Sequence, residues 1–152
     1  MTDTPRPCYL DPGCPLTLAE GLAEFCAANP GLIPADDPQI RELVRAHDAC
    51  HVLFGLTTSL EDEALADTWT VFGTSVTLKQ YSAYLKHEQF TALLREVGAW
   101  ALLKGTLRSV PRMLRAIRRA RAMPEKWPFF DYARFLDTPI AALRRRFGVR
   151  PV

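Results

Sequence analysis

One stretch, residues 38–63, constrains the fold of this chain more than any other part of the sequence. Its first part has the spacing of an amphipathic helix, which places His47 and His51 on one face, a single turn apart. Asp48 stands three residues before His51, and Glu63 follows twelve residues after it. A glycine-containing break before Glu63 lets a second helix return past the first. Two imidazoles and two carboxylates that converge in this way predict a divalent metal site.

Other interpretations of these four side chains are weaker. A single histidine on an apolar helix face is usually a core residue, but two histidines accompanied by two acids are seldom accidental. Burying either carboxylate without a partner would be costly, and a cation removes that cost. Aspartate reaches a bound water less well than glutamate does, which argues against a zinc-protease helix. The ligand types suit Zn²⁺, Fe²⁺ or Mn²⁺, with zinc preferred.

Apolar residues recur at helical spacing along nearly the whole chain, which predicts an all-α, single-domain bundle of about six to seven helices. Residues 1–16 are Pro-rich and are expected to form an extended leader, and residues 17–150 the metal-binding domain. Thr17 and Glu20 have the spacing of a capping box. A strand over residues 69–77 is disfavoured because no partner strand or hairpin turn lies nearby. The expected helices cover residues 17–29, 38–54, 59–73, 76–87, 90–103, 106–122 and 139–147.

The four cysteines do not have the spacing of a metal site, since none form a Cys-x-x-Cys pair. A chain of 152 residues with a helical core does not need disulfides for its stability. Free thiols in a reducing compartment are therefore favoured. A Cys8–Cys14 disulfide across the turn at residues 11–13 stays open as the alternative.

The expected helix over residues 106–122 is strongly basic, with six arginines and no acid, and has Pro111 as a kink or a start. It either packs on the core by its apolar stripe or lies on an anionic membrane surface. Nucleic-acid binding is disfavoured, because the net charge is only +2 and no base-reading motif or aromatic platform is present. The apolar stripe consists of Val110, Met113, Leu114 and Ile117.

The pattern His-Asp-x-x-His-x(11)-Glu, formed by residues 47–63, resembles the metal motif of the ubiquinone (coenzyme Q) biosynthesis protein 4 homologue family. The likeness extends over residues 20–66 and 127–149, whereas residues 73–89 do not follow the family pattern. The segments that carry it beyond the motif are Phe25-Cys26-Ala27-Ala28-Asn29, Val52-Leu53-Phe54-Gly55-Leu56, Leu136-Asp137-Thr138-Pro139-Ile140 and Phe147-Gly148-Val149.

The resemblance implies an all-α protein that binds metal through His47, Asp48, His51 and Glu63 and uses these residues in catalysis. The implied reaction replaces the C1 carboxyl group of a prenylated 4-hydroxybenzoate-type precursor of ubiquinone by hydroxyl. An alternative is a non-catalytic prenyl-lipid-binding or scaffold protein in which the metal is structural.

The resemblance also sets expectations for partners and location. The expected partners are a prenylated aromatic lipid, an anionic membrane surface contacted by the helix of Arg108–Arg121, and other quinone-biosynthesis proteins. A homodimer could form through the aromatic residues 127–130. The N-terminus shows no targeting peptide, and no segment approaches the ~20 apolar residues that span a bilayer. We therefore expect a cytoplasmic protein that is peripheral on the inner face of a membrane.

Overall fold

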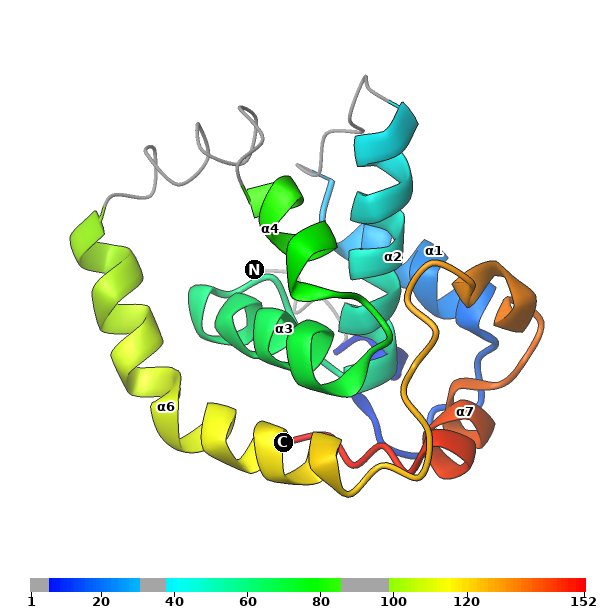
Figure 1. Ribbon diagram of the computed structural model, residues 1–152. Coiled ribbons are helices and arrows are strands. Elements are labelled where there is room, and N and C mark those ends of the chain that lie inside the picture. Colours follow the sequence, from blue (N-terminus) through cyan, green and yellow to red (C-terminus); the bar gives the residue numbers. More distant parts are fainter. Residues whose placement is uncertain (1–5, 31–37, 86–98) are drawn as a thin grey trace.

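The computed structural model describes residues 6–30, 38–85 and 99–152 (Figure 1). Within these ranges every regular element is a helix, and the strand-type pairings are two isolated bridges. The prediction of an all-α bundle is confirmed. The α-helices are α1 (Leu18–Ala28), α2 (Pro38–Phe54), α3 (Leu60–Gly73), α4 (Leu78–Leu85), α6 (Ala99–Arg121) and α7 (Ile140–Phe147), and the short 3₁₀ helices are η1 (Cys8–Leu10) and η2 (Tyr132–Phe135).

Local sequence signals set the ends of the first three α-helices. The capping box predicted at the start of α1 is present, because the Thr17 side chain accepts from the Glu20 N–H and the Glu20 carboxylate accepts from the Thr17 N–H. Ser59 caps α3 by accepting a hydrogen bond from the N–H of Asp62. Gly55 ends α2 with a φ of +69°, a conformation that favours glycine. The predicted break between the two site helices therefore lies at this glycine.

The basic helix α6 is longer than expected. It runs without interruption from Ala99 to Arg121, so the expected separation between a helix over 90–103 and another over 106–122 is wrong. Pro111 lies inside α6, where its ring removes one backbone donor and crowds the preceding turn. Figure 1 shows α6 curving around α3. Residues 90–98 of the expected helix, and the last two residues of the one expected over 76–87, lie outside the described residues.

The face of α6 that packs against α3 consists of small residues. A Cβ atom at Gly105 would lie 3.2 Å from the Cβ atom of Leu60, so the helices approach closely there. Core packing by the expected apolar stripe is wrong at two positions, because Val110 and Leu114 are 39% and 63% exposed. Small residues let α6 approach α3. Val110 and Leu114 remain outside, whereas Met113 is partly buried and packs against the core. Between residues 105 and 121, the buried positions are Gly105, Ser109, Ala116 and Ala120.

Residues 6–16, the described part of the N-terminal segment, pack on the domain and do not form an extended leader. Its residues 8–10 form η1, and the Tyr9 and Cys14 side chains are buried. The carboxylate of Glu24 on α1 accepts hydrogen bonds from the backbone N–H groups of Cys8, at 2.8 Å, and of Tyr9, at 3.0 Å. The prolines of this segment predicted that no long helix forms here, but they gave no sign of η1 or of these tertiary contacts.

The aromatic connector after α6 belongs to the core. Trp127 and Phe129 are fully buried, and the Trp127 ring contacts those of Phe135 and Phe147. The backbone of Trp127 bonds to Gly73 and Ser75, which joins the connector to the end of α3. Within residues 127–130, Phe130 is exposed and Pro128 is half-buried, and the dimer contact through this segment stays a prediction.

The described helices are too short or too polar for a transmembrane span, and none of them qualifies as one.

Candidate metal centre

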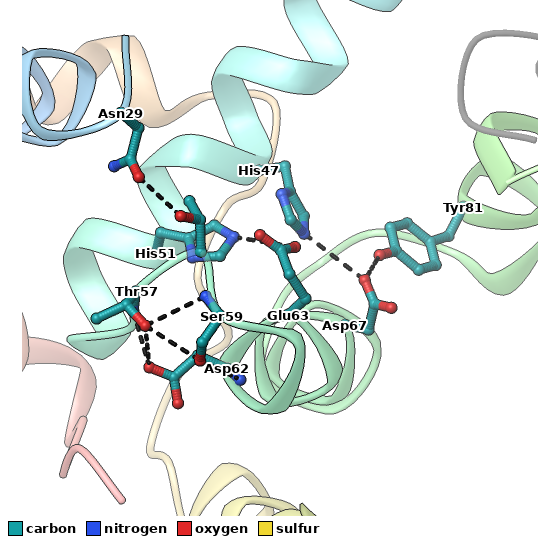
Figure 2. A network of polar contacts seen from close by, with 10 residues as sticks. Asn29, His47, His51, Thr57, Ser59, Asp62, Glu63, Asp67 and Tyr81 are labelled. Atoms are coloured by element: carbon teal, nitrogen blue, oxygen red, sulfur yellow. Dashed lines mark hydrogen bonds and ion pairs between the residues drawn. The ribbon is translucent and has the colours of Figure 1, made fainter. Parts of the chain in front are cut away.

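Two histidines on α2 point toward α3, as their spacing predicted. His47 and His51 are one turn apart on the buried face, and their ring centroids lie 4.8 Å from each other in an edge-to-face arrangement. Figure 2 shows both imidazoles in the space between α2 and α3. The ring of Phe25, on α1, packs on His51 with a centroid distance of 5.2 Å. Two helices and an aromatic ring thus fix the orientation of the imidazoles.

Glu63 on α3 completes a group of three ligand side chains. One ligand atom from each of His47, His51 and Glu63 lies within 4.8 Å of the other two, and the Nε2 atom of His51 is 3.5 Å from a Glu63 carboxylate oxygen. Ligand atoms around a tetrahedral zinc ion lie about 3.3 Å apart, given bonds of about 2.0 to 2.1 Å. The side chains need only small rotations to close on an ion. This group can hold a metal ion.

The buried Nε2 atom of His47 has no hydrogen bond of ordinary length. Its nearest acidic neighbour is a carboxylate oxygen of Asp67, 3.6 Å away. Buried polar groups in folded proteins normally have a close partner, and leaving one without is costly. A cation bound to this nitrogen and to the Nε2 atom of His51 would remove that cost at His47. The loosely paired His47 nitrogen therefore favours a cation at this site over a purely structural pair of histidines.

Asp67 is a site residue that the sequence reasoning missed. It lies one turn after Glu63 on α3, and one of its carboxylate oxygens is 3.6 Å from the Nε2 atom of His47. The same oxygen accepts a hydrogen bond from the hydroxyl group of Tyr81 on α4 (Figure 2). The four-residue spacing from Glu63 was the signal that could have revealed Asp67.

The structure does not bring the predicted ligand Asp48 into the group. Consecutive residues of a helix are rotated by about 100° around its axis. Asp48 is therefore turned away from His47, toward the side of α2 that faces α1. Its carboxylate lines a pocket of about 270 Å³ together with Cys26, Arg45 and Tyr132. Burial there raises the pKa of Asp48. The sequence spacing was compatible with a contact between Asp48 and His51, but α3 approaches from the side of His47.

Asp62 fixes the backbone that carries Glu63. Its carboxylate accepts hydrogen bonds from the backbone N–H of Thr57 at 2.9 Å and from the Thr57 hydroxyl at 2.7 Å. The other carboxylate oxygen is 2.8 Å from the guanidinium group of Arg112 on α6. A carboxylate in the first turn of α3 also faces the positive end of that helix. The start of α3, and with it the position of Glu63, is therefore tied to both the preceding loop and α6.

The charges around His47 shift its protonation. Burial lowers the pKa of His47, but the carboxylates of Asp67, Glu63 and Asp48 raise it, and the result is a pKa above the ordinary value of 6.5. The acidic surroundings thus favour a positive charge at this position, whether it is carried by the imidazolium or by a bound cation.

We expect metal binding at this site to weaken as the pH falls. A metal ion must displace the proton from His47, and the raised pKa means that this competition begins above pH 6.5. Once His47 is protonated, the affinity should drop by about tenfold for each further unit of pH, for one displaced proton. Chelator competition with Zn²⁺ in a series of buffers measures this dependence. An affinity that stays constant from about pH 8 to about pH 6 would contradict the assignment of His47.

Comparisons with known proteins found no relative of this chain. No family model matches the chain, and neither the curated proteins nor the solved structures include a detectable match.

Proposed function

We propose that the protein binds a divalent metal ion through His47, His51 and Glu63 and acts on a prenylated 4-hydroxybenzoate-type precursor in ubiquinone biosynthesis. The observation that carries the metal part is the convergence of three ligand atoms from α2 and α3 within 4.8 Å. The chemical class of the substrate comes from the resemblance of residues 20–66 and 127–149 to the ubiquinone biosynthesis protein 4 homologue family.

An apolar groove beside the metal group suits the prenyl part of such a substrate. The groove has a volume of about 390 Å³ and lies between α3, α4 and α6. Asp67 and Tyr81 line the groove. Tyr81 contacts Asp67 and Asp67 contacts His47, so the groove ends at the edge of the metal group. Pockets for small molecules commonly combine apolar walls with a few polar groups in this way. The apolar part of the lining comes from Ala64, Val71, Phe72, Leu78 and Met113.

The proposed reaction requires an oxidant and a reductant. Replacement of the ring carboxyl group by hydroxyl releases CO₂ and takes one oxygen atom from O₂, while the second leaves as water with two protons and two electrons from an external donor. A bound metal ion supplies Lewis acidity toward the substrate oxygens, and iron would also supply redox chemistry. In this arrangement the Tyr81 hydroxyl, which donates its proton to Asp67, can accept a hydrogen bond from a hydroxyl group of the substrate at the end of the groove.

The number of ligands favours a catalytic role over a structural one. Structural zinc sites are closed by four protein ligands, whereas catalytic sites keep a position open for water or substrate. Three side chains form the group among the described residues, and Asp48 faces away from it. The alternative, a non-catalytic prenyl-lipid-binding or scaffold protein, would need a fourth protein ligand.

The activity is tested with metal-loaded protein, a carboxyl-labelled prenylated 4-hydroxybenzoate, O₂ and a reductant. We expect labelled CO₂ from the wild type, and we expect Val71→Trp, which fills the groove, to lose this activity while it keeps its metal. The matched control is Leu22→Trp, because Leu22 lines the pocket on the other side of α2. Metal-loaded wild type that binds the lipid but releases no CO₂ would contradict the catalytic proposal and favour the scaffold alternative.

The outer face of α6 supports contact with an anionic membrane. Leu107 and Leu114 are 61% and 63% exposed, and Val110 lies between them on the same side of the helix. Exposed arginines flank these apolar side chains, and α6 has no acid among its residues. Apolar side chains that enter the lipid surface between cations that attract its phosphates are typical of membrane-surface helices. The flanking exposed arginines are Arg108, Arg115, Arg118 and Arg121.

We expect the wild type to sediment with vesicles that contain phosphatidylglycerol and to be released by salt, since the attraction is screened. Leu114→Asp should lose most of this binding, and Arg115→Glu should weaken it. Arg134→Glu is the control, because it makes the same charge change on η2 at an exposed position away from α6. Absence of wild-type binding at low ionic strength would contradict the membrane contact.

A further inference from the structure

Two cysteines of the N-terminal segment lie almost at bonding distance. The Sγ atoms of Cys8 and Cys14 are 2.8 Å apart. A disulfide bond is about 2.05 Å long, so a displacement of under about 1 Å separates the two thiols from a covalent bond. Cys26 and Cys50 have no such neighbour among the described residues, and all four cysteines are free thiols in this structure.

The backbone between the two cysteines holds them in this position. The N–H of Asp11 donates to the carbonyl of Cys8 at 2.8 Å, and the N–H of Cys14 donates to the carbonyl of Asp11 at 3.1 Å. The Asp11 carboxylate also accepts from the N–H of Gly13 at 2.7 Å. This turn is thus closed by its own hydrogen bonds before any bond between the sulfur atoms forms. Formation of the disulfide therefore costs little additional loop-closure entropy.

The two thiols differ in access to solvent. Both line a surface pocket of about 290 Å³, together with Arg6 and Asp11. Cys8 is only partly buried, whereas Cys14 is 1% exposed. Burial raises the pKa of Cys14 to about 11, so this thiol keeps its proton in neutral solution. A reagent that enters the pocket therefore meets Cys8 first, and Cys14 stands behind it.

We propose that Cys8 and Cys14 are a redox-active pair that forms a reversible intramolecular disulfide by exchange with a low-molecular-weight disulfide of the glutathione type. The Cys8 thiolate attacks one sulfur of the small disulfide and releases the first small thiol, which leaves a mixed disulfide on Cys8. Cys14 then loses its proton and attacks the Cys8 sulfur, and the second small thiol is released. The two protein thiols are oxidised, and the one small disulfide is reduced to two thiols.

The pair is connected by direct contacts to the helix of the metal group. Arg144 donates hydrogen bonds to the carbonyls of Tyr9 and Asp11, which lie between the two cysteines. The Tyr9 ring packs on Phe25 with a centroid distance of 5.8 Å, and Phe25 packs on His51. Oxidation would link residues 8 and 14 covalently, and Tyr9, whose ring begins this series of contacts, lies in the closed loop. The pair itself does not depend on the proposed metal or on the proposed activity.

The test equilibrates the full chain with mixtures of oxidised and reduced glutathione, quenches with an alkylating reagent and maps the peptides by mass spectrometry. We expect the wild type to lose two thiols together and to give a Cys8–Cys14 linked peptide. The buried Cys50 should react with the alkylating reagent only after the protein is unfolded. Cys14→Ala should instead accumulate glutathione on Cys8, because the resolving thiol is gone. Circular dichroism of each variant confirms that it is folded.

Cys26→Ser is the matched control, because Cys26 is the exposed cysteine outside the pair, and this variant should form the linked peptide as the wild type does. Two results would overturn the proposal. One is wild-type protein that keeps both thiols under conditions where exposed Cys26 is already glutathionylated. The other is glutathione on Cys8 to the same extent in the wild type and in Cys14→Ala.

Discussion

Replacement of His51 by alanine is expected to weaken metal binding by at least about 100-fold, because it removes a buried ligand at the centre of the group. His51 faces both His47 and Glu63, with its Nε2 atom 3.5 Å from the Glu63 carboxylate. Loss of an outer residue that only orients a ligand typically costs about 10- to 100-fold in affinity, and loss of a ligand itself costs more. Glu63→Ala should behave in the same way.

The informative comparison is between two aspartates. Asp48→Ala should keep the metal, because the Asp48 carboxylate lies in the pocket toward α1. Asp67→Ala should bind metal more weakly by about tenfold or more, because the Asp67 carboxylate lies 3.6 Å from the Nε2 atom of His47 and its negative charge favours a cation there. Affinities from chelator competition, measured for all four variants at one pH, give the order. If Asp48→Ala loses metal as completely as His51→Ala does, Asp48 is a metal ligand, as the resemblance to the family motif implies. The ligand set of His47, His51 and Glu63 would then be wrong.

Replacement of Arg144 by alanine is expected to have the largest effect on stability. The Arg144 side chain is 4% exposed, and its guanidinium group donates to the carbonyls of Leu53 at 2.8 Å and of Val52 at 3.0 Å. It also donates to the carbonyls of Tyr9 and Asp11. The first two lie at the end of α2, where helix carbonyls have no partner inside the helix. One buried cation therefore joins α7, the end of α2 and the N-terminal segment.

The expected loss follows from the three buried carbonyls, of Tyr9, Val52 and Leu53, that would lose their donor. Each buried group left without a partner costs about 1 to 3 kcal/mol, so Arg144→Ala should lower the free energy of unfolding by at least about 3 kcal/mol. That is a large part of the roughly 5 to 15 kcal/mol of a typical domain. Arg144→Lys should rescue little, because one ammonium group cannot reach carbonyls on both sides.

Urea unfolding followed by circular dichroism measures this change. Arg145→Ala is the matched control, because Arg145 is the exposed neighbour on the same helix and should change stability by less than about 0.5 kcal/mol. Equal and small effects of the two substitutions would show that the Arg144 hydrogen bonds contribute little.

The sequence predicted the site helices well because their signals are local. The Pro38 start, the Gly55 end and the Ser59 cap of α2 and α3 each depend on a few neighbouring residues, and the structure has all three. The position of His47 and His51 on one face of α2 follows from helix periodicity alone. The position of Glu63 opposite them required only that α3 return antiparallel after the break at Gly55.

The errors concern contacts between distant segments. Asp48 was as well spaced as His47 for a contact with His51, and only the direction from which α3 approaches separates the two. In the same way, apolar periodicity in α6 placed Val110 and Leu114 in one stripe but left open whether this stripe packs on the core or lies on a membrane surface. Packing of small residues against α3 leaves both side chains exposed. The N-terminal segment is held by Glu24 and Arg144, which are 15 or more residues away in the sequence.

The metal content of the wild-type protein shows whether His47, His51 and Glu63 hold an ion. Elemental analysis is carried out on protein purified without added metal, beside a variant that carries both His47→Ala and His51→Ala. We expect about one divalent ion per chain in the wild type and none in the variant, and the identity of the ion separates zinc from redox-active iron. A folded wild type that contains no metal and takes up neither zinc, iron nor manganese would show that these three side chains do not form a metal site.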